Sequence, residues 1–72
     1  MKPLEIKGAR TRLGFSQKYM AEQLNIGGQS YAKKERGIVR FTDREKVIVA
    51  RILGLNARQV NDFFFDGMMP TE

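Results

Sequence analysis

Residues 16–37 read SQKYMAEQLNIGGQSYAKKERG, and this stretch holds the strongest structural signal in the chain. Ser16 is a good N-cap for a helix over residues 17–24, because its hydroxyl can accept a hydrogen bond from a free N–H of the first turn. A tight turn follows, and a further short helix is predicted over about residues 28–36. Gly37 then ends that helix, as glycine often does. The pattern therefore indicates two short helices joined by a tight turn.

The apolar residues of this stretch indicate how the two helices pack. Met20, Ala21 and Leu24 lie on the inner face of the first helix, and the small side chain of Ala21 lets the second helix cross closely. Ile26 fills the angle between the helices, and Tyr31 packs inward one turn later. This geometry turns the start of the second helix outward, where it can enter a DNA groove.

Helices are also predicted on both sides of this pair. Pro3 suits a first helical turn, and Gly14 ends that helix. Thr42 and Glu45 form a capping box for a helix that runs to Leu53, after the short extended connection 38–41. The apolar stripe expected on the first helix consists of Leu4, Ile6, Ala9 and Leu13.

The last predicted helix covers residues 57–65, begins after Asn56 and is closed by Asp66-Gly67. Residues 68–72 are expected to form a loose tail. No segment alternates polar and apolar residues over a strand's length, so no sheet is predicted. The expected class is all-α.

Composition narrows the function. The chain has 72 residues, a net charge of +5, and neither cysteine nor histidine. The positive charge suits DNA or an acidic protein surface. The missing residue types remove the usual metal ligands and general base, so no metal site, no cofactor and no enzymatic activity are expected. No apolar run suggests a signal peptide or a membrane span, and the lack of cysteine fits the reducing cytoplasm that we expect as its location.

Over about residues 4–60 the sequence resembles the Cro/C1-type (XRE) helix-turn-helix family. The resemblance implies a five-helix, lambda-repressor-like helix-turn-helix domain over residues 1–67 that regulates transcription. It is carried by Arg10, Leu13, Gly14, Ser16, Gln17, Ala21, Leu24, Ile26, Tyr31, Glu35, Arg36, Gly37, Ala50, Leu53, Gly54 and Leu55.

The resemblance also implies a set of binding residues. Gln17 would contact a backbone phosphate, and the outward start of the third helix would face base edges. Ordinary solvated charges on a surface helix are the alternative. The residues expected to face bases are Gly28, Gln29, Ser30 and Lys33, and those expected to neutralise phosphates are Lys33, Lys34, Arg36 and Arg40.

Two glycines depart from the family's pattern. Relatives usually carry a hydroxyl cap at the position of Gly27 and often a polar reader at that of Gly28. Lys34 departs as well, because that position is commonly apolar. We expect sequence-specific DNA reading by a single copy to be weak, or else the glycines to let a phosphate or a partner approach the backbone closely.

A second surface is predicted near the C-terminus. Three consecutive phenylalanines, residues 63–65, fan over about 200° of a helix and cannot all face one small core. One of them is expected to stay exposed and to form an apolar interface. The alternative is a tail that folds back over them. The proposed interface residues are Ile48, Ile52, Phe65 and Met68.

Two functions follow. As a whole the sequence is similar to the small MOR (modulator of repression) proteins of temperate lactococcal phages. This implies an antirepressor that binds the helix-turn-helix domain of the phage repressor, with DNA contacts of its own as a further route. The alternative is a Cro-like repressor that binds operator DNA as a homodimer. An antitoxin is less well supported, because the tail is short for a toxin-binding segment.

Overall fold

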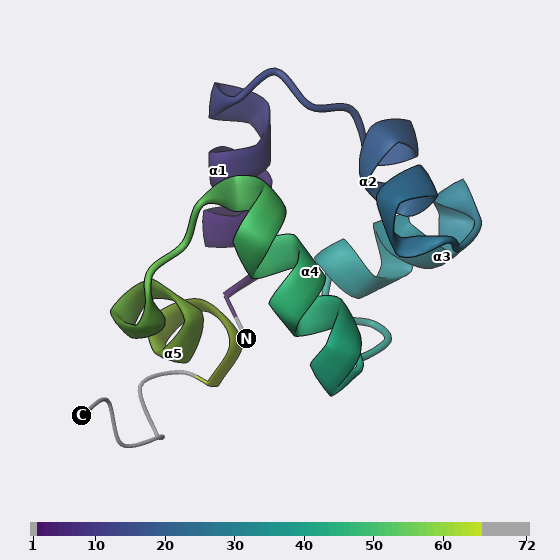
Figure 1. Cartoon of the computed structure of the whole chain (residues 1–72). Helices are drawn as coiled ribbons and strands as arrows, with labels where there is room; N and C mark the ends of the chain where they lie inside the picture. Colours follow the sequence, from purple (N-terminus) through teal and green to yellow (C-terminus); the bar gives the residue numbers. More distant parts are fainter. Residues whose placement is uncertain (1, 66–72) are drawn as a thin grey trace.

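The structure, a computed structural model, describes residues 2–65, which form five α-helices and no strand (Figure 1). The predicted all-α class and helix count are confirmed. The helix end at Asp66-Gly67 and the tail 68–72 lie outside the described residues. The helices are α1 (Pro3–Arg12), α2 (Gln17–Leu24), α3 (Gly28–Glu35), α4 (Asp43–Leu53) and α5 (Ala57–Phe65).

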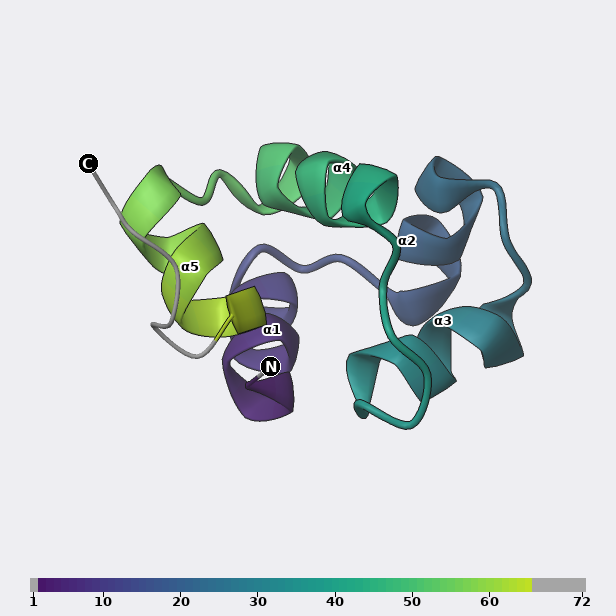
Figure 2. The ribbon, with the colours of Figure 1, turned by 90° about the horizontal axis from the view of Figure 1, so that it is seen from below.

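Helix α4 lies across the middle of the domain. Figures 1 and 2 show α1 and α5 toward one end of it and the α2–α3 pair toward the other. The arrangement is that of a small all-α helix-turn-helix domain. The α2–α3 pair is therefore free on the side that faces away from α5.

Side-chain caps place the helix starts where the sequence indicates them. The Ser16 hydroxyl accepts a backbone N–H of α2 at 3.0 Å. Thr42 and Glu45 form the reciprocal capping box of α4, at 3.1 and 2.8 Å. Asn56 and Gln59 exchange the same pair of bonds at the start of α5, at 2.8 and 2.9 Å. These bonds confirm the predicted caps. Each cap satisfies backbone N–H groups of the first turn, which have no partner within the helix.

Left-handed backbone ends three of the helices at glycine, and the first of these is Gly14, which follows α1 with φ +77°. Gly37 follows α3 with φ +83°, and Gly54 ends α4 with φ +68°. A residue with a Cβ rarely adopts this region. The direction in which the chain leaves α1, α3 and α4 therefore depends on these three residues.

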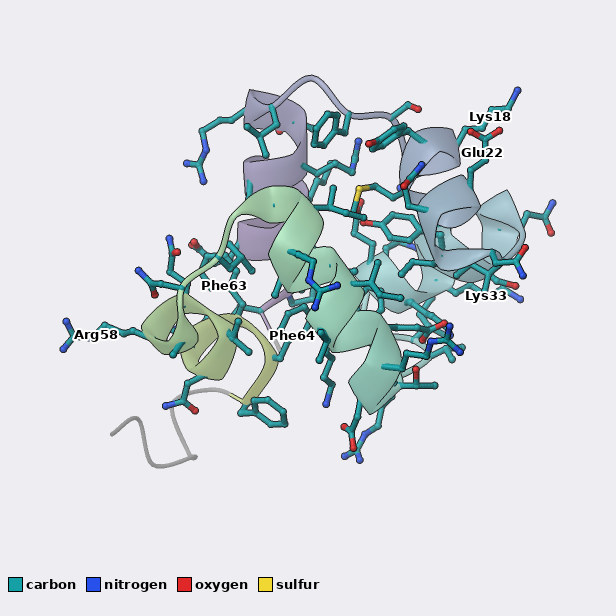
Figure 3. All side chains as sticks on the ribbon, viewed as in Figure 1. Lys18, Glu22, Lys33, Arg58, Phe63 and Phe64 are labelled. Atoms are coloured by element: carbon teal, nitrogen blue, oxygen red, sulfur yellow. The ribbon has the colours of Figure 1, made fainter. Side chains whose placement is uncertain are left out.

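The core contains residues from every helix. Tyr31 and Val49 are fully buried, and the ring of Phe41 meets the edge of Phe64 at 5.7 Å between ring centres. Figure 3 shows Phe63 and Phe64 between α5 and the rest of the domain. The buried apolar residues are Ile6, Ala9, Met20, Ala21, Leu24, Tyr31, Phe41, Val49, Leu53, Phe63 and Phe64.

The stripe predicted on α1 is half wrong. Ile6 and Ala9 are buried, but Leu4 is 82% exposed and Leu13 is 50% exposed. At about 100° per residue, Leu4 is turned by roughly 200° from Ile6. Leu13 lies beyond the last helical residue. The inner face of α1 is completed by Arg10, which is buried.

Candidate partner-binding face of helix α3

The α2–α3 turn directs the start of α3 outward. Asn25 ends α2 in the left-handed region with φ +57°, and the N–H of Ile26 donates to the carbonyl of Ala21 at 3.0 Å. Tyr31 is fully buried, so α3 is held to the domain by its inner face. Gln29 and Ser30 are exposed on the other side.

A buried carboxylate ties α3 to α1 and α2. Arg10 donates to Glu35 through Nε at 2.7 Å and through Nη2 at 3.2 Å. The Tyr31 hydroxyl donates to the same carboxylate at 2.8 Å, and the Gln17 side-chain amide donates to it at 3.1 Å. The remaining Arg10 nitrogen donates to the carbonyl of Phe15 at 2.7 Å. Such a network is stabilising only when every member is paired, as here.

The network sets the ionisation of its members. Burial by itself opposes charge on Glu35, but the hydrogen bonds from Arg10, Gln17 and Tyr31 outweigh it and lower the pKa of Glu35. The hydrogen bond to Glu35 raises the pKa of Arg10. Burial, followed by the bond to Glu35, raises the pKa of Tyr31. Near neutral pH, Glu35 therefore stays a negatively charged carboxylate and Arg10 a positively charged guanidinium.

Gln17 lies in a different place from the predicted phosphate contact. Its side chain is half-buried and its amide nitrogen donates to Glu35. The donor that the resemblance assigns to DNA is used here inside the molecule. We therefore leave Gln17 out of the exposed face.

Lys34 also requires a correction. Its ammonium lies 2.5 and 2.7 Å from the two carboxylate oxygens of Glu45, and both side chains are largely buried. Burial opposes charge on Glu45, but the bonds from Lys34 and from the Thr42 backbone N–H outweigh it and lower the pKa of Glu45. Lys34 therefore joins α3 to α4 and is not a solvent-facing cation. The pair also explains a charged residue where an apolar one was expected.

The other predicted residues of α3 do come together. Gln29, Lys33 and Arg36 follow one another at spacings of four and three residues, which places them on one side of a helix. All three are exposed, and so are Gly28 and Ser30. We call Gly28, Gln29, Ser30, Lys33 and Arg36 the α3 face. Arg40, the last of the predicted residues, is exposed on the α3–α4 loop.

The start of α3 has no side-chain cap. Gly27 occupies the N-cap position with ordinary extended backbone, and no side chain accepts a bond there. A Cβ added at Gly28 would meet no atom within 4 Å, and one at Gly27 would meet only the Ser30 hydroxyl, at 4.0 Å. The packing of the domain therefore does not require either glycine. Their effect is to leave the backbone of the α3 face accessible.

Two features of this side were missed at the sequence level. Lys18 projects from α2 on the same side as Lys33, with Glu22 next to it (Figure 3). The loop residues Ile38 and Val39 are exposed although both are large and apolar. No signal in the sequence separates them from Phe41, which lies in the same predicted connection and is buried in the core.

The residues of the predicted apolar interface near the C-terminus are partly buried where the structure describes them. Ile48 and Ile52 are partly buried and pack against the core. Phe65 is partly buried too, with the ammonium of Lys46 at 4.2 Å from its ring centre. Met68 lies outside the described residues. The large apolar residue that α4 does expose is Val47.

The part of the chain that the structure describes contains no group of three or more carboxylates placed to hold a metal ion. None of its helices is long and apolar enough to cross a membrane. Comparisons of the chain with protein-family models, curated proteins and solved structures found no match. The α3 face is therefore interpreted from its own chemistry.

Proposed function

We propose that this protein is a transcriptional regulator of a temperate phage that acts as an antirepressor. It binds the N-terminal helix-turn-helix domain of the phage repressor and keeps that domain from its operator. One observation carries the proposal: the α3 face combines exposed cations with a glycine start, which leaves only Gln29 and Ser30 as side chains able to read bases. Such a face attracts acidic groups but discriminates poorly between bases.

The neighbouring loop favours a protein over DNA. Ile38 and Val39 are exposed beside Arg36 and Arg40 in the sequence. Phosphates make no use of apolar side chains, whereas protein interfaces place apolar groups next to charged ones. A repressor domain that offers carboxylates to Lys33 and Arg36 would bind here and lose its own access to DNA.

The second candidate function is a Cro-like homodimer that binds operator DNA. It is favoured by the net charge of +5 and by Lys33, Arg36 and Arg40, which form no ion pair among residues 2–65. This function requires two copies, repeated half-sites and a strong dependence of affinity on salt. The protein is a non-enzymatic binding module under either function.

Gel shifts test the proposal. Operator DNA from the region between this gene and a neighbouring repressor gene is mixed with this protein, with the repressor, and with both. We expect the repressor's shift to disappear when both are present. Tight sequence-specific binding by this protein alone would support the Cro-like function, and tighter joint binding would contradict the antirepressor.

Charge reversal locates the surface. Lys33→Glu should abolish the effect on the repressor. Arg58→Glu is the matched control, since Arg58 is exposed on α5 and points to the opposite side in Figure 3. Equal loss in both variants would indicate a general effect of net charge and would remove the α3 face from the proposal.

A further inference from the structure

We infer that a groove between the start of α1 and the α3–α4 loop is a docking site for an acidic protein segment that carries an apolar side chain. The groove has a volume of about 310 Å³ and is lined by Pro3, Arg36, Gly37, Val39 and Arg40. We call it the α1–loop groove. Figure 2 shows the first turn of α1 and this loop side by side at the lower edge of the domain.

The charge of the groove comes from two cations that have no carboxylate partner in the part of the chain that the structure describes. Arg36 and Arg40 are exposed, and neither takes part in an ion pair among residues 2–65. By contrast, Arg10 and Lys34 are held by Glu35 and Glu45. Two guanidinium groups on one groove favour carboxylates, which they bind through paired N–H donors.

The apolar part of the groove is equally exposed. Val39 lines it and is 44% exposed, while Ile38, the residue before it, is 64% exposed. Leu4 directly follows Pro3, the residue that lines the groove from α1. Exposed apolar residues that are bordered by charge are typical of protein-binding surfaces.

These features together select one occupant. A second copy of this chain would bring a net charge of +5 and another pair of arginines toward the first. DNA would use Arg36 and Arg40 but leave Val39 and Ile38 in water. An acidic segment of a partner protein suits both the charged and the apolar part of the groove. Its carboxylates would bind the two arginines, and one apolar side chain would pack against Val39.

This inference rests on the proposed function in so far as the partner is a repressor. It extends that function by adding a surface beside the α3 face and by stating the chemistry of the segment that fills it. The α3 face and the α1–loop groove share Arg36, so one partner can cover both. Variants that avoid Arg36 can separate the two surfaces.

The test compares three variants for binding to the repressor's N-terminal domain by calorimetry. Val39→Ser removes the apolar contact, and we expect affinity to fall about fivefold or more, as for a residue inside an interface. Val47→Ser is the matched control, an exposed valine on α4 that lies outside the groove. Lys33→Glu reports on the α3 face alone.

A second measurement uses the wild-type chain and two synthetic peptides. One peptide has a single leucine among glutamates and aspartates, and in the other serine replaces the leucine. Amide resonances of Gly37, Val39 and Arg40 should shift with the leucine peptide and much less with the serine peptide. This measurement needs no repressor.

The outcomes are distinguishable. If Lys33→Glu loses binding and Val39→Ser does not, the groove is overturned and the proposed function stands. If the wild-type protein does not bind the repressor domain, the proposed function is overturned, and the peptide titration alone supports or overturns the groove. A fourth variant, Arg40→Gln, is titrated with duplex DNA. If it binds DNA more weakly than the wild type, while Val39→Ser binds the repressor domain and the leucine peptide as the wild type does, the occupant is DNA and the inference fails.

Discussion

Arg10 and Glu35 lie 25 residues apart in the sequence and meet as a buried ion pair, with 2.7 Å between Nε and Oε2. The pair joins α1 to the last residue of α3. Gln17 and Tyr31 donate to the same carboxylate, so the position of α3 depends on both preceding helices. The proposed binding face is thus held by a buried electrostatic network next to the apolar core.

Removal of either charge should unfold much of the population. Loss of one partner from a buried ion pair costs about 3–5 kcal/mol, because the other charge is left without compensation. That is comparable with the whole stability expected for so small a domain, about 3–5 kcal/mol. We expect Arg10→Ala and Glu35→Ala to lose most helical circular dichroism at 25 °C.

Asp62→Ala is the control for these variants. Its ion pair with Lys2 is exposed, and such pairs contribute about 0–1 kcal/mol. The variant should therefore keep a wild-type urea midpoint. A fully helical Arg10→Ala protein would show that the network does not hold α3 in place.

Acid should destabilise the protein through two carboxylates. The pKa values of Glu35 and Glu45 are lowered in the folded state, so the unfolded chain binds more protons at low pH. Their stabilisation is fully present above the unfolded-state pKa of about 4.3 and is lost as pH falls through the folded values. The free energy of unfolding, measured with urea, should decrease below about pH 4.5.

The chain has no histidine, so no side chain with an ordinary pKa near 6.5 titrates between acid and neutral pH. The same measurement should therefore give a flat stability from about pH 6 to pH 8. A decrease in stability within that range would contradict this account. Glu45→Gln should make the acid transition shallower.

Substitution of the glycine at the start of α3 should stabilise the fold. Gly28 has room for a Cβ, so Gly28→Ala should raise the free energy of unfolding by about 0.4–1 kcal/mol, through lower entropy of the unfolded chain. Gly37→Ala, at φ +83°, should instead lower it by about 1 kcal/mol or more. Denaturation midpoints check both. If Gly28→Ala is more stable but binds its partner less well, the partner contacts the backbone at this residue.

Two adjacent lysines should behave in opposite ways. Lys34→Met keeps an apolar stem but leaves Glu45 without its cation, and the loss of charge-assisted hydrogen bonds costs about 1.5–3 kcal/mol. Lys33→Met should change stability by less than about 0.5 kcal/mol, as surface substitutions usually do. Partner binding should weaken in Lys33→Met and be retained in the folded fraction of Lys34→Met. Equal effects on both properties would remove the distinction between the two residues.

The salt dependence of binding to nonspecific duplex DNA should show how many of the exposed cations contact phosphates. If Lys33, Arg36 and Arg40 each neutralise one phosphate, the slope of log affinity against log salt should be near −3, at about −0.9 per contact. Arg40→Gln should reduce its magnitude by about 1. Fluorescence anisotropy at several salt concentrations measures both slopes. A slope near zero would exclude DNA as a ligand of this side of the domain.

Local chemistry allowed the helices to be predicted well. Ser16, Thr42 and Asn56 each satisfy N–H groups within three residues of themselves, so their effect can be read without the fold. Gly37 and Gly54 act through their own φ angles. For these reasons the five helices begin, and the first four end, close to where the sequence indicates.

The candidate site could be predicted only in part. The i, i+4, i+7 spacing of Gln29, Lys33 and Arg36 is a property of any helix and places them together. Gln17 and Lys34 were assigned to the surface because their partners, Glu35 and Glu45, lie 18 and 11 residues away. A sequence does not show which of several carboxylates a cation will meet.

Residues within about two turns of one another set the all-α class, the helix starts and the spacing of charges along α3, so these features could be predicted without the fold. Three others depend on the fold: the burial of Arg10, the contact of Lys34 with α4, and the groove that Val39 borders with Pro3. Burial depends on which helices pack together. That packing sets both the cost of a buried charge and the identity of the group that compensates it.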